Sequence, residues 1–184
     1  ARSSTSPPAS APKSPAGAGP RLLFYPGSSI GNFTPAEALG FLRQVHATSQ
    51  GGGLLIGVDL VKPVTVLEPA YDDPLGVTAA FNRNLLRHIN RLAGTDFRLQ
   101  DWRHVAFFNA AESRIEMHLE ALGALTVRWA DGERSFVRGE RIHTENSYKW
   151  QPGDFAALLG EAGFRPPRQW TDAQGWFALF MAQA

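Results

Sequence analysis

The sequence predicts an α/β fold in which a strand–helix–strand unit and a closing helix with two strands enclose an inserted α+β module. Two observations predict it. Runs of consecutive apolar residues indicate buried strands, and strict alternation of apolar and polar residues in the middle indicates a half-buried strand. The 184 residues suffice for one domain with a hydrophobic core, or for one domain and part of another. We expect four segments, at residues 1–20, 21–61, 62–149 and 150–184.

Residues 1–20 form a low-complexity arm that consists almost entirely of Ala, Ser, Pro and Gly. Such a segment buries too little apolar surface to offset the entropy of ordering it, so we expect a disordered arm or linker. The composition does not indicate what this arm does. The folded part is predicted to begin near Arg21.

Residues 21–61 form the predicted strand–helix–strand unit. Leu22 to Tyr25 is a short apolar run that ends at a Pro-Gly pair, which indicates a buried strand. Thr34 and Glu37 have the spacing of a capping box, with Pro in the first turn of the helix that follows. Residues 54–60 are apolar at nearly every position, as in a strand covered on both faces. We expect the two strands to be parallel neighbours with a right-handed crossover.

In residues 62–149 the sequence pattern differs from that of the first unit. The first element predicted there is a helix from Ala79 to Leu92. Its predicted apolar face holds Phe81, Leu85, Leu86 and Ile89. Its other face is basic and holds Arg83, Arg87, His88 and Arg91. This basic cluster fits either a nucleic-acid patch or a solvated helix face, and the low net charge of the chain favours the solvated face.

Antiparallel strands are predicted for the rest of this segment. Residues 114–119 alternate between polar and apolar side chains, which indicates a half-buried strand. Residues 125–129 and 135–137, separated by an Asp-Gly pair, predict a hairpin. A parallel unit interrupted by a helix and antiparallel strands indicates an inserted α+β module.

Residues 150–184 again have the pattern of helices and apolar strands predicted for residues 21–61. Residues 152–162 predict an amphipathic helix that stops at a glycine, and residues 164–170 and 176–181 predict two closing strands. A helix followed by an antiparallel pair is common at the end of doubly wound methyltransferase folds, although a fold by itself names no reaction.

Composition narrows the class of protein. The formal net charge is +1, so we expect no special attraction to nucleic acid or to a membrane surface. The chain has no cysteine, which excludes disulfides and thiolate metal sites and fits a cytoplasmic protein. No apolar run approaches the roughly 20 residues that span a bilayer.

Four segments form a specific pattern in content, order and separation: FYPGSSIGNF at 24–33, AYDDPLGVTAAFNRNLL at 70–86, RIEMHL at 114–119 and GERIHTENSYKW at 139–150. In this pattern the chain, from Leu22 to its end, resembles the C-terminal half of the histidine-specific Nα-methyltransferases of ergothioneine biosynthesis. The resemblance implies a partial doubly wound methyltransferase (Rossmann-like) fold in which residues 62–149 form most of a substrate-binding module.

The resemblance also implies a reaction. S-adenosyl-L-methionine would methylate the α-amino group of L-histidine stepwise to Nα,Nα,Nα-trimethylhistidine (hercynine), without a metal. Such a site needs donors for the α-carboxylate and partners for the imidazole, because much of the rate comes from aligning nitrogen, carbon and sulfur. The family pattern places substrate-binding residues at Gly27, Asn32, Tyr71, Thr78, Met117, Glu145 and Ser147.

Four of these positions have an ordinary alternative. Asn32 follows a strand, where its amide could bind both the carboxylate and the amine, but Asn is also a common turn residue. Gly27 would let the backbone approach the amine, or it is a plain turn glycine. The hydroxyl of Tyr71 could bind the carboxylate, or Tyr71 is an amphipathic surface residue. Thr78 would lie near the substrate, or it caps the helix that starts at Ala79.

Glu145 and Ser147 are the most informative pair, because alternation puts both on one face of an extended segment. A carboxylate and a hydroxyl together can hold both nitrogens of a neutral imidazole, whereas the alternative is an exposed Glu and Ser at a strand end. Met117 would shape the pocket wall or simply belong to the core. A pocket for an indole has no reason to keep a carboxylate at Glu145.

The family's glycine-rich cofactor loop has no counterpart before Arg21, so the main cofactor-binding residues are unknown. We therefore expect a fragment, a truncated gene product or one half of a split enzyme, inactive by itself and in need of a missing N-terminal half. Two alternatives remain: a relative that acts on another aromatic amino acid, and a non-catalytic amino-acid-binding remnant.

The five histidines show no ligand-like spacing with one another or with carboxylates, so we expect no metal site. They are His46, His88, His104, His118 and His143. No residue is identified as a catalytic general base, and water could take the proton of the amine.

Overall fold

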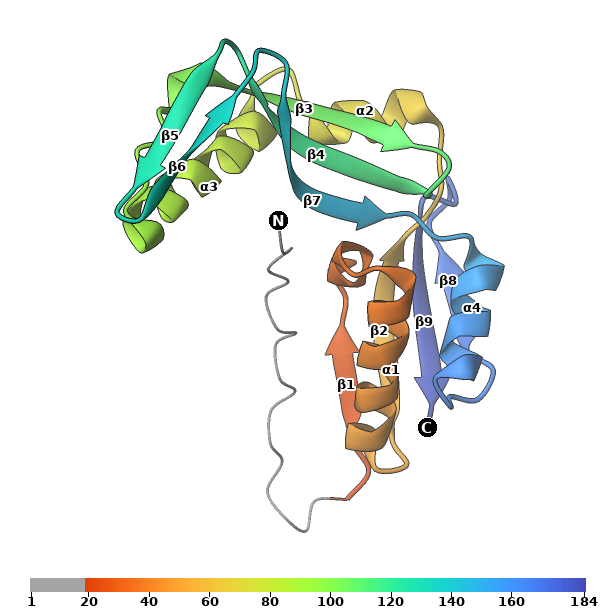
Figure 1. Ribbon diagram of the computed structural model, residues 1–184. Coiled ribbons are helices and arrows are strands. Elements are labelled where there is room, and N and C mark those ends of the chain that lie inside the picture. The colour runs from red at the N-terminus through yellow and green to blue at the C-terminus, as the bar shows by residue number, and fades with distance from the viewer. Residues whose placement is uncertain (1–18) are drawn as a thin grey trace. The chain divides into compact units, whose positions relative to one another are not determined.

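The computed structural model describes residues 19–184 (Figure 1). Residues 1–18, which hold nearly all of the predicted arm, lie outside the described residues. The chain divides into two compact units. The first comprises the chain up to Leu60 together with Trp150–Ala184, and the second is Val61–Lys149.

The first unit contains a four-stranded sheet in the order β1-β2-β9-β8. β1 is parallel to β2, and β9 is antiparallel to both β2 and β8. The predicted parallel pair and the predicted antiparallel closing pair are therefore confirmed. The bounds are β1 Leu22–Tyr25, β2 Gly53–Asp59, β8 Arg168–Thr171 and β9 Phe177–Gln183.

Two helices accompany this sheet. Helix α1 is Pro35–Ser49, and the predicted capping box is present, since the side chains of Thr34 and Glu37 each accept from the other's backbone N–H. Helix α4 is Pro152–Glu161, and it buries Phe155 against the ring of Phe180 from β9, with 5.1 Å between the centroids. These contacts give the unit an α/β core, as the sequence predicts.

The prediction that β1 is buried is wrong. Leu22 is 60% exposed and Phe24 is 67% exposed, whereas the alternate residues Leu23 and Tyr25 are partly buried. β1 is the outer strand in the described sheet, so it has one neighbour, and its alternate side chains point to a face that the described residues leave open.

The second unit is built on a three-stranded antiparallel sheet in the order β3-β4-β7. Helix α2 packs against β3 and β4, and helix α3 packs against the same two strands. The bounds are α2 Val64–Tyr71, α3 Val77–Ala93, β3 Trp102–Asn109, β4 Arg114–Ala121 and β7 Arg141–Tyr148. The predicted hairpin is confirmed as β5 Leu125–Trp129 and β6 Gly132–Phe136.

Two predictions about burial in this unit are wrong. β4 is buried on both faces, since Glu116, His118 and Glu120 are 7%, 9% and 7% exposed. Arginines from β3, β4 and β7 pair with these carboxylates and cover the polar face. On α3 the buried stripe runs through Asn82 and Leu86, so the predicted apolar residue Phe81 is 62% exposed instead.

Short 3-10 turns complete the described elements: η1 is Ser29–Asn32 and η2 is Leu99–Asp101. Among residues 19–184, every helix is too short or too polar to cross a membrane.

Candidate functional site

The seven predicted substrate-binding residues are divided between the two units. Gly27 and Asn32 belong to the first unit, on the loop at the carboxyl end of β1, as predicted. Both are exposed. The convergence of these two with the other five residues stays a prediction.

The loop that carries Gly27 and Asn32 is held by a hydrogen bond within the loop and by one from β2. The Ser28 hydroxyl accepts from the backbone N–H of Asp59 at 2.8 Å, and the Ser28 carbonyl accepts from Gly31 at 2.9 Å. Ile30 and Gly31 are buried inside this turn. A side chain at Gly57 would collide with the Pro26 carbonyl, so glycine in β2 lets this loop lie close to the sheet.

In the second unit the structure brings Tyr71 and Ser147 together. Their hydroxyl oxygens are 2.7 Å apart, although the residues are 76 positions apart in the chain. The ammonium of Lys149 donates to the Tyr71 hydroxyl at 2.8 Å and to the Ser147 hydroxyl at 2.7 Å. We call these three residues the hydroxyl–ammonium triangle.

Lys149 is 3% exposed and its Nζ lies 4.7 Å from the centre of the Tyr71 ring. A buried ammonium is costly unless it is hydrogen-bonded, and the two hydroxyls and the ring face offset that cost. Lys149 is not among the seven predicted substrate-binding residues. The signal was present, because alternation extends the face of Glu145 and Ser147 by two more residues to Lys149.

Glu145 lies on the same face of β7 and pairs with Met117 of β4 across the sheet. Among the described residues, no side chain donates a hydrogen bond to its carboxylate. Burial therefore raises the pKa of Glu145, and the nearby charge of Lys149 opposes that rise. A half-buried carboxylate without a donor is suited to accept an N–H from a ligand.

Met117 is 4% exposed and belongs to a small apolar cluster with Leu67 and Ile115. Tyr71 and Phe108 pack against this cluster. The structure therefore places Met117 in the core, on the face that carries Glu145 and Ser147, where it excludes water from one side of these polar groups.

Tyr71 is positioned by the attachment of α2 to β3. The carboxylate of Glu68 accepts from the backbone N–H of Phe108 at 3.0 Å. His104 Nε2 lies 2.8 Å from the Tyr71 carbonyl, and the amide of Asn82 lies 2.9 Å from His104 Nδ1. These contacts fit the arrangement in which Nδ1 accepts from the amide and Nε2 donates to the carbonyl at the end of α2.

Thr78 has a structural role that differs from the predicted cap. Helix α3 begins at Val77, and Asp73 caps it: its carboxylate accepts from the backbone N–H groups of Val77 at 3.0 Å and Thr78 at 2.8 Å. These bonds, with one from the Thr78 side chain, lower the pKa of Asp73 to about 2. The interpretation of Thr78 as the N-cap is wrong, because the cap is supplied from the preceding turn.

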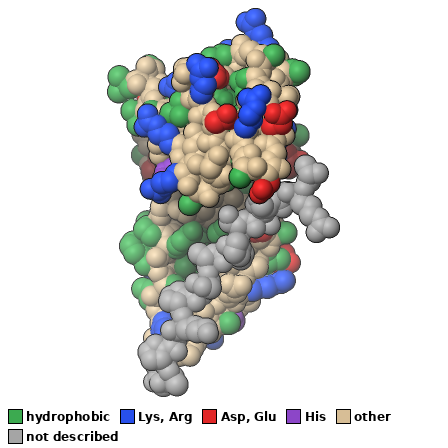
Figure 2. All heavy atoms as spheres, turned by 60° about the vertical axis from the view of Figure 1, so that its left-hand side comes forward, with side chains coloured by type: hydrophobic (Ala, Val, Ile, Leu, Met, Phe, Trp, Pro, Cys, Tyr) green, Lys and Arg blue, Asp and Glu red, His purple; other side chains and the backbone are tan. Residues whose placement is uncertain are grey.

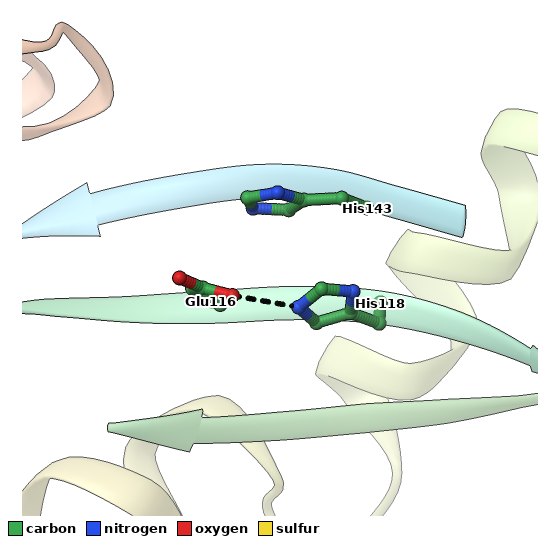
Figure 3. A group of neighbouring side chains, drawn as sticks. All are labelled: Glu116, His118 and His143. Atoms are coloured by element: carbon green, nitrogen blue, oxygen red, sulfur yellow. Dashed lines mark hydrogen bonds and ion pairs between the residues drawn. The ribbon is translucent and has the colours of Figure 1, made fainter. Parts of the chain in front are cut away.

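The opposite face of the same sheet carries a second cluster of polar residues. Figure 3 shows Glu116 and His118 on β4 and His143 on the neighbouring strand β7. His118 Nε2 is 3.0 Å from Glu116, and the rings of His118 and His143 stack with 4.5 Å between their centres. The ligand-type atoms of these three residues lie within 4.8 Å of one another.

The interpretation that the histidines lack ligand-like spacing is therefore wrong, because cross-strand pairing brings His143 to residues distant in sequence. The carboxylate of this cluster is nevertheless already bound by a cationic side chain, Arg114. Burial raises the pKa of Glu116, but hydrogen bonds from Asn109, Arg114 and His118 outweigh burial and lower it to about 2. Arg114 already binds Glu116 at 2.7 Å, so a dication here would lie next to a guanidinium. The expectation of no bound metal stays a prediction.

The surface of the second unit mixes both signs of charge. Arg128 pairs with Glu133 at 3.2 Å and Arg134 with Glu140 at 3.1 Å on the β5–β6 hairpin and the turn after it. Figure 2 shows Lys and Arg side chains beside Asp and Glu side chains on the face in view. This mixture does not have the single sign that favours nucleic-acid binding.

Comparison with known proteins shows which family this chain is similar to. Residues 7–184 match the family described as "Histidine-specific methyltransferase, SAM-dependent". The chain is 48% identical over 167 residues to the histidine N-alpha-methyltransferase of Mycolicibacterium smegmatis, and 46% identical over 167 residues to that of Mycobacterium tuberculosis. Each alignment covers 89% of this chain and 52% of the relative.

A fungal protein is also similar. Ergothioneine biosynthesis protein 1 of Neurospora crassa is 30% identical over 159 residues, which are 82% of this chain and 17% of that protein. The chain thus spans about half the length of the two bacterial relatives. It belongs to the family of histidine-specific, S-adenosylmethionine-dependent methyltransferases.

Proposed function

We propose that this chain is the histidine-binding part of a methyltransferase that converts L-histidine stepwise to Nα,Nα,Nα-trimethylhistidine, the first step of ergothioneine biosynthesis. One observation carries the proposal: Glu145 and the hydroxyl–ammonium triangle lie on one face of one sheet. The names of the two bacterial relatives and of the Neurospora crassa protein support the same substrate and pathway.

The ring of neutral histidine needs one acceptor and one donor. Glu145 is an acceptor for the ring N–H, and the Ser147 hydroxyl can donate to the second nitrogen. Tyr71, beside the Lys149 cation, is a donor for the α-carboxylate, and Asn32 is proposed as a further partner of the carboxylate and the amine. Gly27 and Thr78 are proposed as substrate-binding residues on the family pattern alone.

Methylation requires the amine nitrogen to attack a sulfonium methyl in line, so the residues of this chain contribute by holding the amino acid still. S-adenosylmethionine supplies the methyl group. The turn between β1 and α1 is closed by the Ser28 hydrogen bonds and by buried Ile30, and it does not offer an open glycine-rich cradle. We propose that this closed turn contributes little to the binding of S-adenosylmethionine.

An indole amino acid is a weaker candidate substrate. An indole offers one N–H to Glu145 but no second nitrogen, so the Ser147 donor would lose a partner. A site built to hydrogen-bond a substrate group discriminates strongly against an analogue that lacks the group.

A non-catalytic amino-acid-binding role is the second candidate, because the groups that the structure brings together are suited to hold a ligand and none of them is identified as a catalytic base. In both cases the proposed partner is a small molecule rather than nucleic acid or membrane, which the mixed surface charge supports. A cytoplasmic location belongs to the same proposal.

The test is methyl transfer by the complete gene product with S-adenosylmethionine and equal concentrations of histidine and tryptophan, followed by mass spectrometry. We expect mono-, di- and trimethylhistidine to accumulate and tryptophan to remain unmodified. Faster methylation of tryptophan would contradict the substrate assignment. Histidine binding by calorimetry without methyl transfer would favour the binding role.

A further inference from the structure

We propose that Lys149 is a positioning residue for histidine recognition, because its ammonium holds the oxygens of Tyr71 and Ser147 and leaves their hydroxyl hydrogens for the ligand. The inference rests on the proposed function and assigns a role to a residue outside the seven predicted substrate-binding positions. It follows from the hydrogen-bond inventory of the triangle.

The triangle contains two hydroxyl groups and one ammonium group. Each hydroxyl has one hydrogen to donate, whereas an ammonium has three and accepts none. Lys149 donates to both oxygens, at 2.8 Å to Tyr71 and 2.7 Å to Ser147. In the 2.7 Å contact between the two oxygens one hydroxyl donates to the other, so the structure uses one of the two hydroxyl hydrogens internally.

A histidine ligand changes this balance. Its carboxylate and its unprotonated ring nitrogen are both acceptors, so they require two donors. When the Tyr71–Ser147 bond opens, each hydroxyl can turn its hydrogen to one of these acceptors. Each oxygen still accepts from Lys149, so no buried oxygen loses its partner during the exchange.

The donor and acceptor roles within the triangle also select one tautomer of the histidine ring. With Lys149 present, Ser147 is the donor and Glu145 is the acceptor, so the neutral ring binds in one tautomer. Without the ammonium, either hydroxyl could rotate and present its oxygen instead. The same cation opposes the rise in the pKa of Glu145 that burial causes, which favours the ionised acceptor.

A purely structural role of Lys149 predicts a different result. A buried lysine that only filled space could be replaced by methionine, which has a similar unbranched chain and no charge to desolvate. The stability of such a variant would stay the same or increase, and histidine affinity would not change. The proposal therefore separates affinity from stability.

The experiment compares Lys149→Met with the native complete gene product. Thermal unfolding checks the fold, and calorimetry measures histidine affinity. We expect the affinity to fall about tenfold to a hundredfold, because hydrogen bonds to a charged group are lost on the oxygens that touch the ligand. Lys149→Gln, which keeps a neutral donor, is expected to lose less, and it decides the matter if Lys149→Met fails to fold.

A double-mutant cycle of Ser147→Ala and Lys149→Met tests the coupling between these two residues. Ser147→Ala should weaken histidine binding in the native background and have a smaller effect when Lys149 is already methionine, because the two act as a unit. Ser135→Ala, an exposed hydroxyl on β6, is the matched control and should change nothing. Equal effects of Ser147→Ala in both backgrounds, or native affinity in a folded Lys149→Met protein, would overturn the proposal.

A separate measurement distinguishes failure of the inference from failure of the proposed function. If the native protein binds no histidine, the proposed function is wrong, but carbon-13 NMR can still follow the carboxyl group of Glu145. Loss of the Lys149 charge should raise the pKa of Glu145 further above its ordinary value. An unchanged pKa would show that Lys149 does not act on this face of the sheet.

Discussion

Glu116 and Glu145 are two carboxylates on opposite faces of one antiparallel sheet, and their environments differ completely. Glu116 accepts hydrogen bonds from Asn109, Arg114 and His118, and its pKa is lowered to about 2. Glu145 has no side-chain donor among the described residues, and burial raises its pKa. The comparison shows that one sheet can hold both a closed ionic network and a carboxylate in need of a partner.

The difference separates stability from function. A carboxylate whose partners are already in place contributes to folding but has little left to offer a ligand. A carboxylate that is desolvated without a donor costs stability, and such groups are concentrated at functional sites. The face of Glu116 is therefore expected to respond to mutation mainly in stability, and the face of Glu145 mainly in ligand binding.

The largest expected effect on stability comes from Arg114→Met. Arg114 is 19% exposed and binds both Glu116 and the hydroxyl of Tyr148. Its loss leaves a buried carboxylate poorly compensated, which we expect to lower the free energy of unfolding by about 3 kcal/mol. Denaturant unfolding of the complete gene product measures it.

The control is Arg128→Met, since the Arg128–Glu133 pair is 62% and 59% exposed and should contribute less than about 1 kcal/mol. Equal effects of the two substitutions would show that the Glu116 network is no more important than a surface ion pair.

Glu145→Ala is expected to act in the opposite way. Histidine affinity should fall about tenfold to a hundredfold, because the ring N–H loses a charged acceptor. The free energy of unfolding should stay the same or rise, because a half-buried carboxylate that accepts no hydrogen bond from a described side chain is removed. Calorimetry and denaturant unfolding on the same preparation test both statements, and unchanged affinity would remove Glu145 from the site.

The pH dependence should differ in sign between the two carboxylates. The folded-state pKa of Glu116 is depressed, so its contribution to stability is present above its ordinary pKa of 4.5 and is lost as the pH falls toward about 2. The folded-state pKa of Glu145 is raised, so its protonated form favours folding, and that contribution is lost as the pH rises through the raised value.

Stability curves of Glu116→Gln and Glu145→Gln against pH test this contrast, because each substitution removes one of the two dependences. Histidine affinity, which needs ionised Glu145, should increase as the pH rises through the same raised pKa. Parallel curves for the two variants would mean that the two faces do not differ electrostatically.

The smallest effect is expected from the cap of α3. Asp73→Ala removes the acceptor for the first amides of the helix, so Tm should decrease, and by less than for Arg114→Met. Asp72→Ala, one residue earlier, is the matched control and should leave Tm unchanged. A larger loss for Asp73→Ala than for Arg114→Met would reverse the proposed order of importance.

Local signals in the sequence determined much of the fold. The capping box of Thr34 and Glu37, the β5–β6 hairpin and the parallel pairing of β1 with β2 were readable, because each depends on residues close in sequence or on simple periodicity. The pair Glu145 and Ser147 was readable for the same reason, although its interpretation as a histidine site came from the resemblance to a family.

Only the tertiary structure decided the remaining features, because they depend on pairing between distant segments. It showed that Tyr71 on α2 meets Ser147 and Lys149 at the end of β7, and that His143 stacks on His118 across two strands. Alternation assigns a side chain to a face but does not say which helix covers that face or which charges neutralise it. That is why two glutamates in similar strands became an ionic network in one case and a candidate ligand contact in the other.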